Sequence, residues 1–278
     1  MSTRHLPVIG GHPTTFGGTL RTDNWRIGPI ATVCMISSAI AYLTWAMFQG
    51  NHYYAAPYLS PIYSPVLFTK LDVAGAAPLE HAWFGAWPTW WPSLAFLPVS
   101  PGFLILPFPA LFRFTCYYYR KAYYRSFGGS PPGCAVSPGV RPTYRGETRL
   151  WLFQNLHRYA LYIALIFVVI LTYDAVLAFF KHGQFGIGVG TLVICINTAL
   201  ISSYTFGCHS FRHLIGGRTD RMSDKGQSTS KMSAWKGATW FNGRHMNFAW
   251  CSLGWVAFTD VYVRLVSMGV ITDLNTWD

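Results

Sequence analysis

Two candidate membrane spans of more than twenty residues contain no charged side chain. Residues 27–48 form a stretch of 22 residues and residues 186–208 a stretch of 23. A bilayer core needs about 20 consecutive apolar residues to be crossed by one helix. Only 11% of the 278 residues are charged and 51% are hydrophobic, whereas soluble domains have about 25% charged residues. The sequence therefore predicts a multi-span membrane protein and excludes a soluble nucleic-acid binder, in spite of a net charge of +11.

The hydrophobic pattern predicts an all-α polytopic membrane bundle with five transmembrane helices. These helices are expected at about residues 27–48, 100–125, 150–181, 186–215 and 237–268. The N-terminal arm, residues 1–26, lacks the apolar core and cleavage site of a signal peptide, and residues 27–278 form a single membrane domain. The loop 49–99 is rich in Pro and Trp, which predicts a structured cap at the membrane interface.

Basic residues are distributed unequally between the two sides of this predicted bundle. Of the 21 Lys and Arg residues, 16 fall in the arm and in the segments 120–149 and 212–244. The opposite side holds Lys70, Lys181 and Arg264. By the positive-inside rule, the N-terminus is expected in the cytoplasm and the C-terminus outside. Near the outer face, Asp260 and Arg264 have the i,i+4 spacing that allows a pair on one helix face.

Four Cys and His residues are predicted to share one depth in the cytoplasmic half of the bundle. Depth is measured from a basic residue of each cytoplasmic segment: Cys116 lies nine residues before Arg125, His157 eight after Arg149, Cys208 ten before Arg218 and His245 nine after Lys236. The helix rise of about 1.5 Å per residue places each roughly 12–15 Å inside that boundary. Because an imidazole at membrane depth is costly, such residues are candidates for a functional site.

Several chemistries are consistent with this layer. Two Cys and two His are the ligand set of a Rieske-type [2Fe-2S] centre. Two His from different helices could instead hold haem b, with the cysteines as packing residues, and a Cys/His zinc site is formally possible. A cofactor-free channel or transporter is a further alternative, although the sequence lacks the inverted repeats common in transporters.

Four segments of the sequence support a more specific hypothesis. They read RFTCYYYR at 113–120, QNLHRY at 154–159, YTFGCHSFRH at 204–213 and FTDVYVR at 258–264. In these segments the chain resembles the membrane-anchor (cytochrome b-like) subunit of actinobacterial-type succinate dehydrogenase, respiratory complex II. The similarity covers roughly residues 100–270, and the first hundred residues match only in general plan.

The resemblance implies a place in the respiratory chain and the tricarboxylic acid cycle. In such complexes a flavoprotein subunit oxidises succinate, an iron–sulfur subunit carries the electrons, and the anchor holds both at the bacterial cell membrane. No succinate-oxidising site is then expected on this chain. The basic cytoplasmic rim is expected to dock the iron–sulfur subunit, and the electron acceptor is a quinone, expected to be menaquinone.

The resemblance also implies a cofactor, because anchors of this type hold a Rieske-type cluster where more familiar anchors hold haem b. On this basis Cys116 and Cys208 are assigned to one iron, and His157 and His245 to the other. The four share a depth and come from different helices. Cys134 and His209 are the alternate ligands, and a haem b anchor is the alternative cofactor reading.

Three residues are expected to bind the quinone. Tyr119, Arg212 and His213 lie about one helical turn nearer the cytoplasm than the assigned ligands, which would let them hydrogen-bond a quinone carbonyl. His213 is also the expected proton relay, because imidazole titrates near physiological pH.

Overall fold

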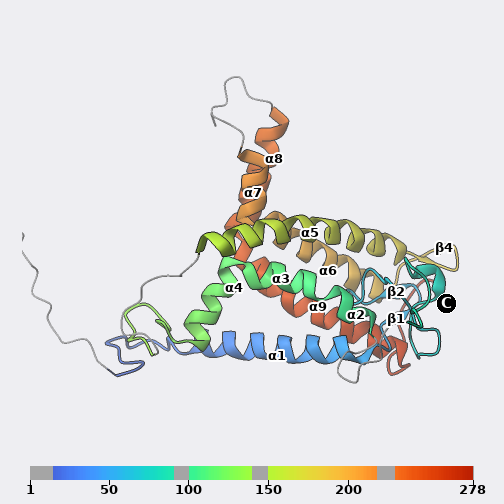
Figure 1. Ribbon diagram of the computed structural model, residues 1–278, viewed down its shortest axis with the longest axis horizontal. Helices are drawn as coiled ribbons and strands as arrows, with labels where there is room; N and C mark the ends of the chain where they lie inside the picture. Colours follow the sequence, from blue (N-terminus) through green and yellow to red (C-terminus); the bar gives the residue numbers. More distant parts are fainter. Residues whose placement is uncertain (1–14, 91–99, 140–149, 218–228, 278) are drawn as a thin grey trace, which may run out of the picture. The chain divides into compact units, whose positions relative to one another are not determined.

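The computed structural model describes residues 15–90, 100–139, 150–217 and 229–277, and these are mostly helical (Figure 1). The all-α expectation is confirmed. The chain divides into two compact units, one of Met1–Ser38 with Cys116–Leu150 and one of Ala39–Thr115 with Trp151–Asp278. The long helix α1, Ile27–Gln49, continues through the boundary between them.

In the smaller unit, the first described residues pack against a loop. Thr19 Oγ1 donates a hydrogen bond to the carbonyl oxygen of Ala135 at 2.6 Å. A Cβ atom at Gly139 would lie 2.9 Å from the ring of Phe16, so this close approach requires glycine. The unit also contains α4, Tyr117–Ala122, and the π-helix η2, Tyr123–Phe127.

In the larger unit, both short and long helices form the bundle. They are α2 (Pro101–Ile105), α3 (Pro107–Thr115), α5 (Leu150–Leu177), α6 (Val189–Phe206) and α9 (His245–Ser267). Trp255 of α9 donates from Nε1 to the carbonyl oxygen of Val193 on α6 at 3.0 Å. Thr198 of α6 donates to the carbonyl oxygen of Leu171 on α5 at 3.2 Å. Two further helices, α7 (His209–Gly216) and α8 (Thr229–Gly243), pack against each other.

Three of the five expected helices are interrupted. The segment expected at 100–125 is α2, α3, α4 and η2, and the first two begin with Pro101 and Pro107. Proline is tolerated at a helix start because its missing N–H would be unpaired there in any case. The expected helix 186–215 is α6 followed by α7, and the segment 237–268 is covered by α8 and α9. For the segment 100–125 the prolines predict an irregular start, which the structure has, whereas the segments 186–215 and 237–268 have junctions where the sequence predicted continuous helices.

The cap expected over residues 49–99 is described up to residue 90. It contains the hairpin of β1 (Tyr54–Ala55) and β2 (Tyr58–Leu59), and the 3₁₀ turn η1 (Leu79–His81). Tyr53 and Tyr63 stack with ring centroids 4.3 Å apart, and both are fully buried. A second hairpin, β3 (Phe180–Lys181) with β4 (Gln184–Phe185), follows α5. Buried tyrosines therefore give this irregular segment a core of its own.

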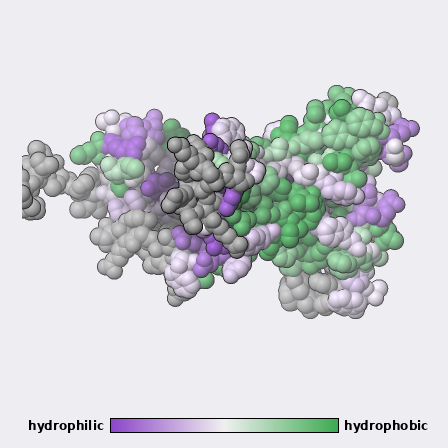
Figure 2. Space-filling model, turned by 90° about the horizontal axis from the view of Figure 1, so that it is seen from above, coloured by the Kyte–Doolittle hydropathy of each residue, from purple (hydrophilic) through white to green (hydrophobic). Residues whose placement is uncertain are grey.

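Among the described residues, three helices are long and apolar enough to cross a membrane: α1, Trp151–Leu177 of α5, and α6. Only 17% of the apolar window of α1 and 33% of that of α5 is buried. Figure 2 shows the resulting broad hydrophobic surface on one face. Apolar side chains left exposed on this scale indicate contact with lipid rather than water.

Candidate functional site

Three of the four residues assigned as ligands lie at the helix junctions. Cys116 directly precedes α4, Cys208 directly precedes α7, and His245 is the first residue of α9. Both cysteines have extended backbone, with ψ of 134° and 137°, and neither side chain caps its helix. Ser, Thr, Asp and Asn are the residues that normally stabilise such positions. The two thiols are thus placed where local helix stability gives no reason for cysteine.

His157 on α5 is held by hydrogen bonds on both ring nitrogens. Its Nδ1 lies 2.9 Å from Thr115 Oγ1, and its Nε2 lies 3.0 Å from Cys208 Sγ. Thr115 uses its single hydroxyl proton to donate to the carbonyl oxygen of Leu111 at 2.8 Å. The Thr115 oxygen therefore accepts from His157 Nδ1–H, and the lone pair of Nε2 faces the thiol. This is the tautomer in which Nε2 can bind a metal.

His245 is buried at the start of α9, with 3% of its surface exposed. Its ring stacks on that of Tyr204 at a centroid distance of 4.8 Å and an angle of 10°. The backbone of Gly207 closes over the imidazole, since a Cβ atom there would lie 3.1 Å from His245 Nδ1. His245 therefore lies beside the residue that immediately precedes Cys208.

An aromatic pair links the two imidazoles. Phe112 stacks on His157 at 4.7 Å and 6°, and it meets the ring of Tyr204 edge-on at 5.3 Å. The guanidinium of Arg113 lies 4.9 Å from the centre of the Tyr204 ring. Arg113 also donates to the carbonyl oxygen of Ala249 at 3.1 Å and to Ser252 Oγ at 2.9 Å, both on α9. The positive charge of Arg113 is therefore fixed beside the Tyr204 ring, which in turn stacks on His245.

The structure brings His157 and Cys208 into contact and places His245 next to them through Tyr204 and Gly207. Cys116 belongs to the smaller unit and follows Thr115 directly in the chain. Thr115 is itself the hydrogen-bond partner of His157. Over residues 15–90, 100–139, 150–217 and 229–277, no set of three or more His, Cys, Asp or Glu side chains has the arrangement of a metal site.

The donor chemistry of these residues nevertheless suits a mixed Cys/His metal centre. Such a centre needs two thiolate and two imidazole ligands. The thiols are those of Cys116 and Cys208 at the helix junctions. The imidazoles are those of the buried His245 and of His157, whose Nε2 lone pair is available to a metal. The two alternate ligands, Cys134 and His209, are less suitable for such a centre. Cys134 is exposed, with its carbonyl oxygen accepting from Arg21 Nη1 at 3.0 Å, and His209 is exposed at the start of α7.

The residues expected to bind quinone lie in different surroundings. Tyr119 is buried on α4 in the smaller unit. The guanidinium of Arg212 lies 4.8 Å from the centre of the Trp235 ring. The Nδ1 atom of His213 is 3.0 Å from Arg158 Nη2. Because a guanidinium can only donate, His213 Nδ1 accepts, and a neutral His213 carries its proton on Nε2.

Sequence reasoning missed Thr115, Gly207, Phe112 and Tyr204, whose importance depends on contacts between distant segments. Two further residues did carry a signal, since Arg113 and Arg158 are charges inside expected spans. A charge at membrane depth is a functional candidate by default, and both side chains contact residues of the candidate site.

Comparison with known proteins decides the family. The family model described as actinobacterial succinate dehydrogenase subunit SdhC matches residues 27–269. The chain belongs to this SdhC family. Among solved structures it is similar to a chain of the Mycobacterium smegmatis Sdh1 complex in the apo form. That chain is 39% identical, with a TM-score of 0.78, over 92% of this chain and 93% of the other. No curated protein matches the chain.

Membership of the SdhC family confirms the resemblance that the four sequence segments carried. The protein is a membrane-anchor subunit of actinobacterial succinate dehydrogenase, an oxidoreductase complex. The three membrane-competent helices agree with that role.

Proposed function

We propose that this anchor binds a Rieske-type [2Fe-2S] cluster and passes electrons from the iron–sulfur subunit to quinone. Cys116 and Cys208 would hold one iron, and His157 and His245 the other. When bound, such a cluster accepts and releases one electron, at a potential that imidazole ligation raises. The observation that carries the proposal is the fixed tautomer of His157, whose Nε2 faces Cys208 Sγ at 3.0 Å.

The same contact favours the cluster over haem b. A haem b would need imidazoles as its iron ligands and no thiol, whereas His157 Nε2 faces the thiol of Cys208. A mixed Cys/His centre needs both thiolate and imidazole donors, and the contact between His157 and Cys208 brings one donor of each kind to the same place. Thr115, by holding Nδ1–H, would orient the imidazole in the way that metal-binding histidines are usually supported.

We further propose five spans: α1, the broken segment α2 to α4, α5, α6 and α9. The N-terminus would lie in the cytoplasm and the C-terminus outside. The excess of basic residues in the segments 120–149 and 212–244 supports this orientation. On the cytoplasmic side, the iron–sulfur and flavoprotein subunits would dock on this basic rim, which includes the exposed α7–α8 hairpin. The similarity to a chain of the Sdh1 complex supports partner subunits.

Quinone, which we expect to be menaquinone, would bind between this rim and the cluster. His213 would donate its Nε2 proton to a quinone carbonyl, because Arg158 holds its Nδ1 as an acceptor. Arg212 and Tyr119 would complete the set of donors. Complete reduction of a quinone takes up two electrons and two protons, so a donor that can be reprotonated from the cytoplasm is needed at this position.

Spectroscopy of the purified complex tests the proposal. Reduction with succinate should give an EPR signal with the low average g value of mixed His/Cys ligation, and no haem absorption bands. The variants His157→Ala and His245→Ala should each lose this signal and quinone reduction, but keep succinate oxidation by a soluble dye. His182→Ala, which removes an exposed imidazole from the β3–β4 turn, should behave as the wild type. A haem spectrum, or an anchor without iron, would overturn the assignment.

A further inference from the structure

A cleft of about 1140 Å³ lies in the larger unit between α5 and the cap. Its α5 wall consists of Val169, Ile170, Tyr173, Asp174 and Leu177. The facing wall comes from η1, the β1–β2 hairpin and the loop around it, and the β3–β4 hairpin adds one edge. Pockets for small molecules are commonly about 300–1,000 Å³, so the space is large enough for an extended amphiphile. None of the residues proposed to bind cluster or quinone lines it.

The α5 wall of this cleft is continuous with a surface that faces lipid. Val169 is 69% exposed and Tyr173 is 61% exposed, on a helix with a mean hydropathy of 2.4. Exposed apolar side chains on a membrane-spanning helix contact acyl chains. One side of the cleft is therefore an open path for a hydrocarbon chain lying along α5.

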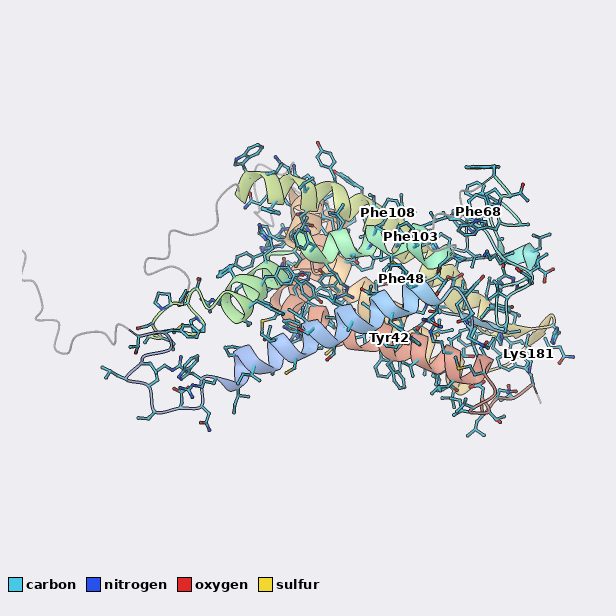
Figure 3. The ribbon with its side chains drawn as sticks, turned by 60° about the horizontal axis from the view of Figure 1, so that its bottom comes forward. Tyr42, Phe48, Phe68, Phe103, Phe108 and Lys181 are labelled. Carbon is cyan, nitrogen blue, oxygen red and sulfur yellow. The ribbon has the colours of Figure 1, made fainter. Side chains whose placement is uncertain are left out.

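The lining of the cleft also carries charges of both signs. Asp174 and Glu80 contribute carboxylates, and Lys181, His81 and His182 contribute a cation and two imidazoles. Figure 3 shows Lys181 at the cap end of the molecule. Asp174 is held by a hydrogen bond to its Oδ2 from Ser64. The His81 ring packs on Tyr54 at 5.1 Å, while its Nδ1 is buried and has no hydrogen-bond partner within the described part of the chain.

We propose that this cleft binds one molecule of phosphatidylethanolamine. The Asp174 carboxylate would accept hydrogen bonds from the lipid ammonium group, and Lys181 and His81 would bind its phosphate. The acyl chains would lie along Val169 and Tyr173. The two carboxylates disfavour a purely anionic headgroup, and a choline headgroup has no N–H to donate to Asp174. A carboxylate near the end of a membrane helix is costly without such a partner.

The lipid content of the purified complex tests this inference independently of the cluster and quinone proposals. The complex is extracted from membranes that contain phosphatidylethanolamine, phosphatidylglycerol and phosphatidylcholine, and bound lipid is measured by native mass spectrometry. We expect about one retained phosphatidylethanolamine per chain. Lys181→Gln should weaken its affinity about tenfold, the effect of about 1.4 kcal/mol, so that less of it is retained, and Asp174→Asn should do the same.

Two comparisons keep the test decisive. Asp72→Asn removes a carboxylate from the cap that does not line this cleft, and it should leave the bound lipid unchanged. If Asp174→Asn impairs folding, Lys181→Gln still tests the inference, because Lys181 lies on an exposed hairpin. Retention of an anionic lipid, of phosphatidylcholine or of quinone in place of phosphatidylethanolamine would overturn the inference. So would equal phosphatidylethanolamine occupancy in the wild type and Lys181→Gln.

Discussion

Arg264 Nε donates to Asp260 Oδ2 at 2.7 Å in a pair whose side chains are only 4% and 0% exposed. The i,i+4 pairing predicted from the sequence is confirmed. The pair also holds together segments that are far apart in the chain. Tyr42 of α1 donates to Asp260 at 2.6 Å where α1 meets α9 (Figure 3), and Arg264 donates to the carbonyl oxygen of Asn51 at 2.9 Å. A single ion pair therefore joins α1, the cap and α9.

Removing one partner of this pair should destabilise the anchor strongly. Asp260→Asn or Arg264→Met leaves a buried charge uncompensated, which costs about 3–5 kcal/mol. We expect a lower unfolding temperature of the detergent-solubilised complex. The control is Asp23→Asn, which breaks the exposed pair with Arg21 and should change stability by no more than about 0.5 kcal/mol. Equal unfolding temperatures for Asp260→Asn and Asp23→Asn would show that the buried pair contributes little.

Gly207→Ala should disturb the proposed metal centre without removing a ligand. A Cβ atom at this position would lie 2.9 Å from the carbonyl oxygen of Phe241 and 3.1 Å from His245 Nδ1. Because backbone cannot move aside cheaply, His245 must shift, and we expect a weakened or altered EPR signal. Gly237→Ala on α8 is the matched control, since nothing lies within 4 Å of its Cβ position. An unchanged signal in Gly207→Ala would show that this contact does not position His245.

The depth argument placed His157 and Cys208 in one layer, and the structure brings these two into contact, because residues at equal depth on packed helices can meet. It did not predict the junction between α6 and α7 or that between α8 and α9. The break after α6 is stabilised by a long-range contact instead. Asn242 donates from Nδ2 to the carbonyl oxygen of Gly207 at 2.8 Å, across 35 residues. A junction fixed by such a contact has no local sequence signature.

The contacts of the neutral residues around the two imidazoles could not be predicted from the sequence either. Thr115, Phe112 and Tyr204 are ordinary apolar-helix residues by composition, and only their contacts with His157 and His245 give them a role. Charged and metal-binding residue types stand out in an apolar span because they are costly there. A threonine or an aromatic ring is not costly, so it gives no comparable signal.

Arg113 should raise the reduction potential of the proposed cluster. Its guanidinium is fixed by α9 and lies 4.9 Å from the centre of the Tyr204 ring, which stacks on His245. A nearby positive charge stabilises the reduced, more negative state of the cluster. Arg113→Met should therefore lower the midpoint potential in an EPR-monitored redox titration, and Arg113→Lys should lower it less.

The variant Ser252→Ala separates charge from hydrogen bonding in this test. It removes the 2.9 Å acceptor of Arg113 Nη2 but keeps the positive charge. We expect its midpoint potential to stay close to that of the wild type. If Ser252→Ala and Arg113→Met lowered the potential equally, the hydrogen bond rather than the charge would be responsible.

Arg158 should control the proton donated by His213. With Arg158 Nη2 at 3.0 Å from Nδ1, the proton of a neutral His213 is held on Nε2. Arg158→Met removes this preference, so we expect slower quinone reduction and a changed pH profile, while succinate oxidation by a soluble dye is unchanged. Arg158→Lys keeps a donor and should restore much of the rate. His213→Ala should lower quinone reduction by about 100-fold, the lower range for loss of a general acid. A wild-type pH profile in Arg158→Met would instead assign Arg158 a purely structural role.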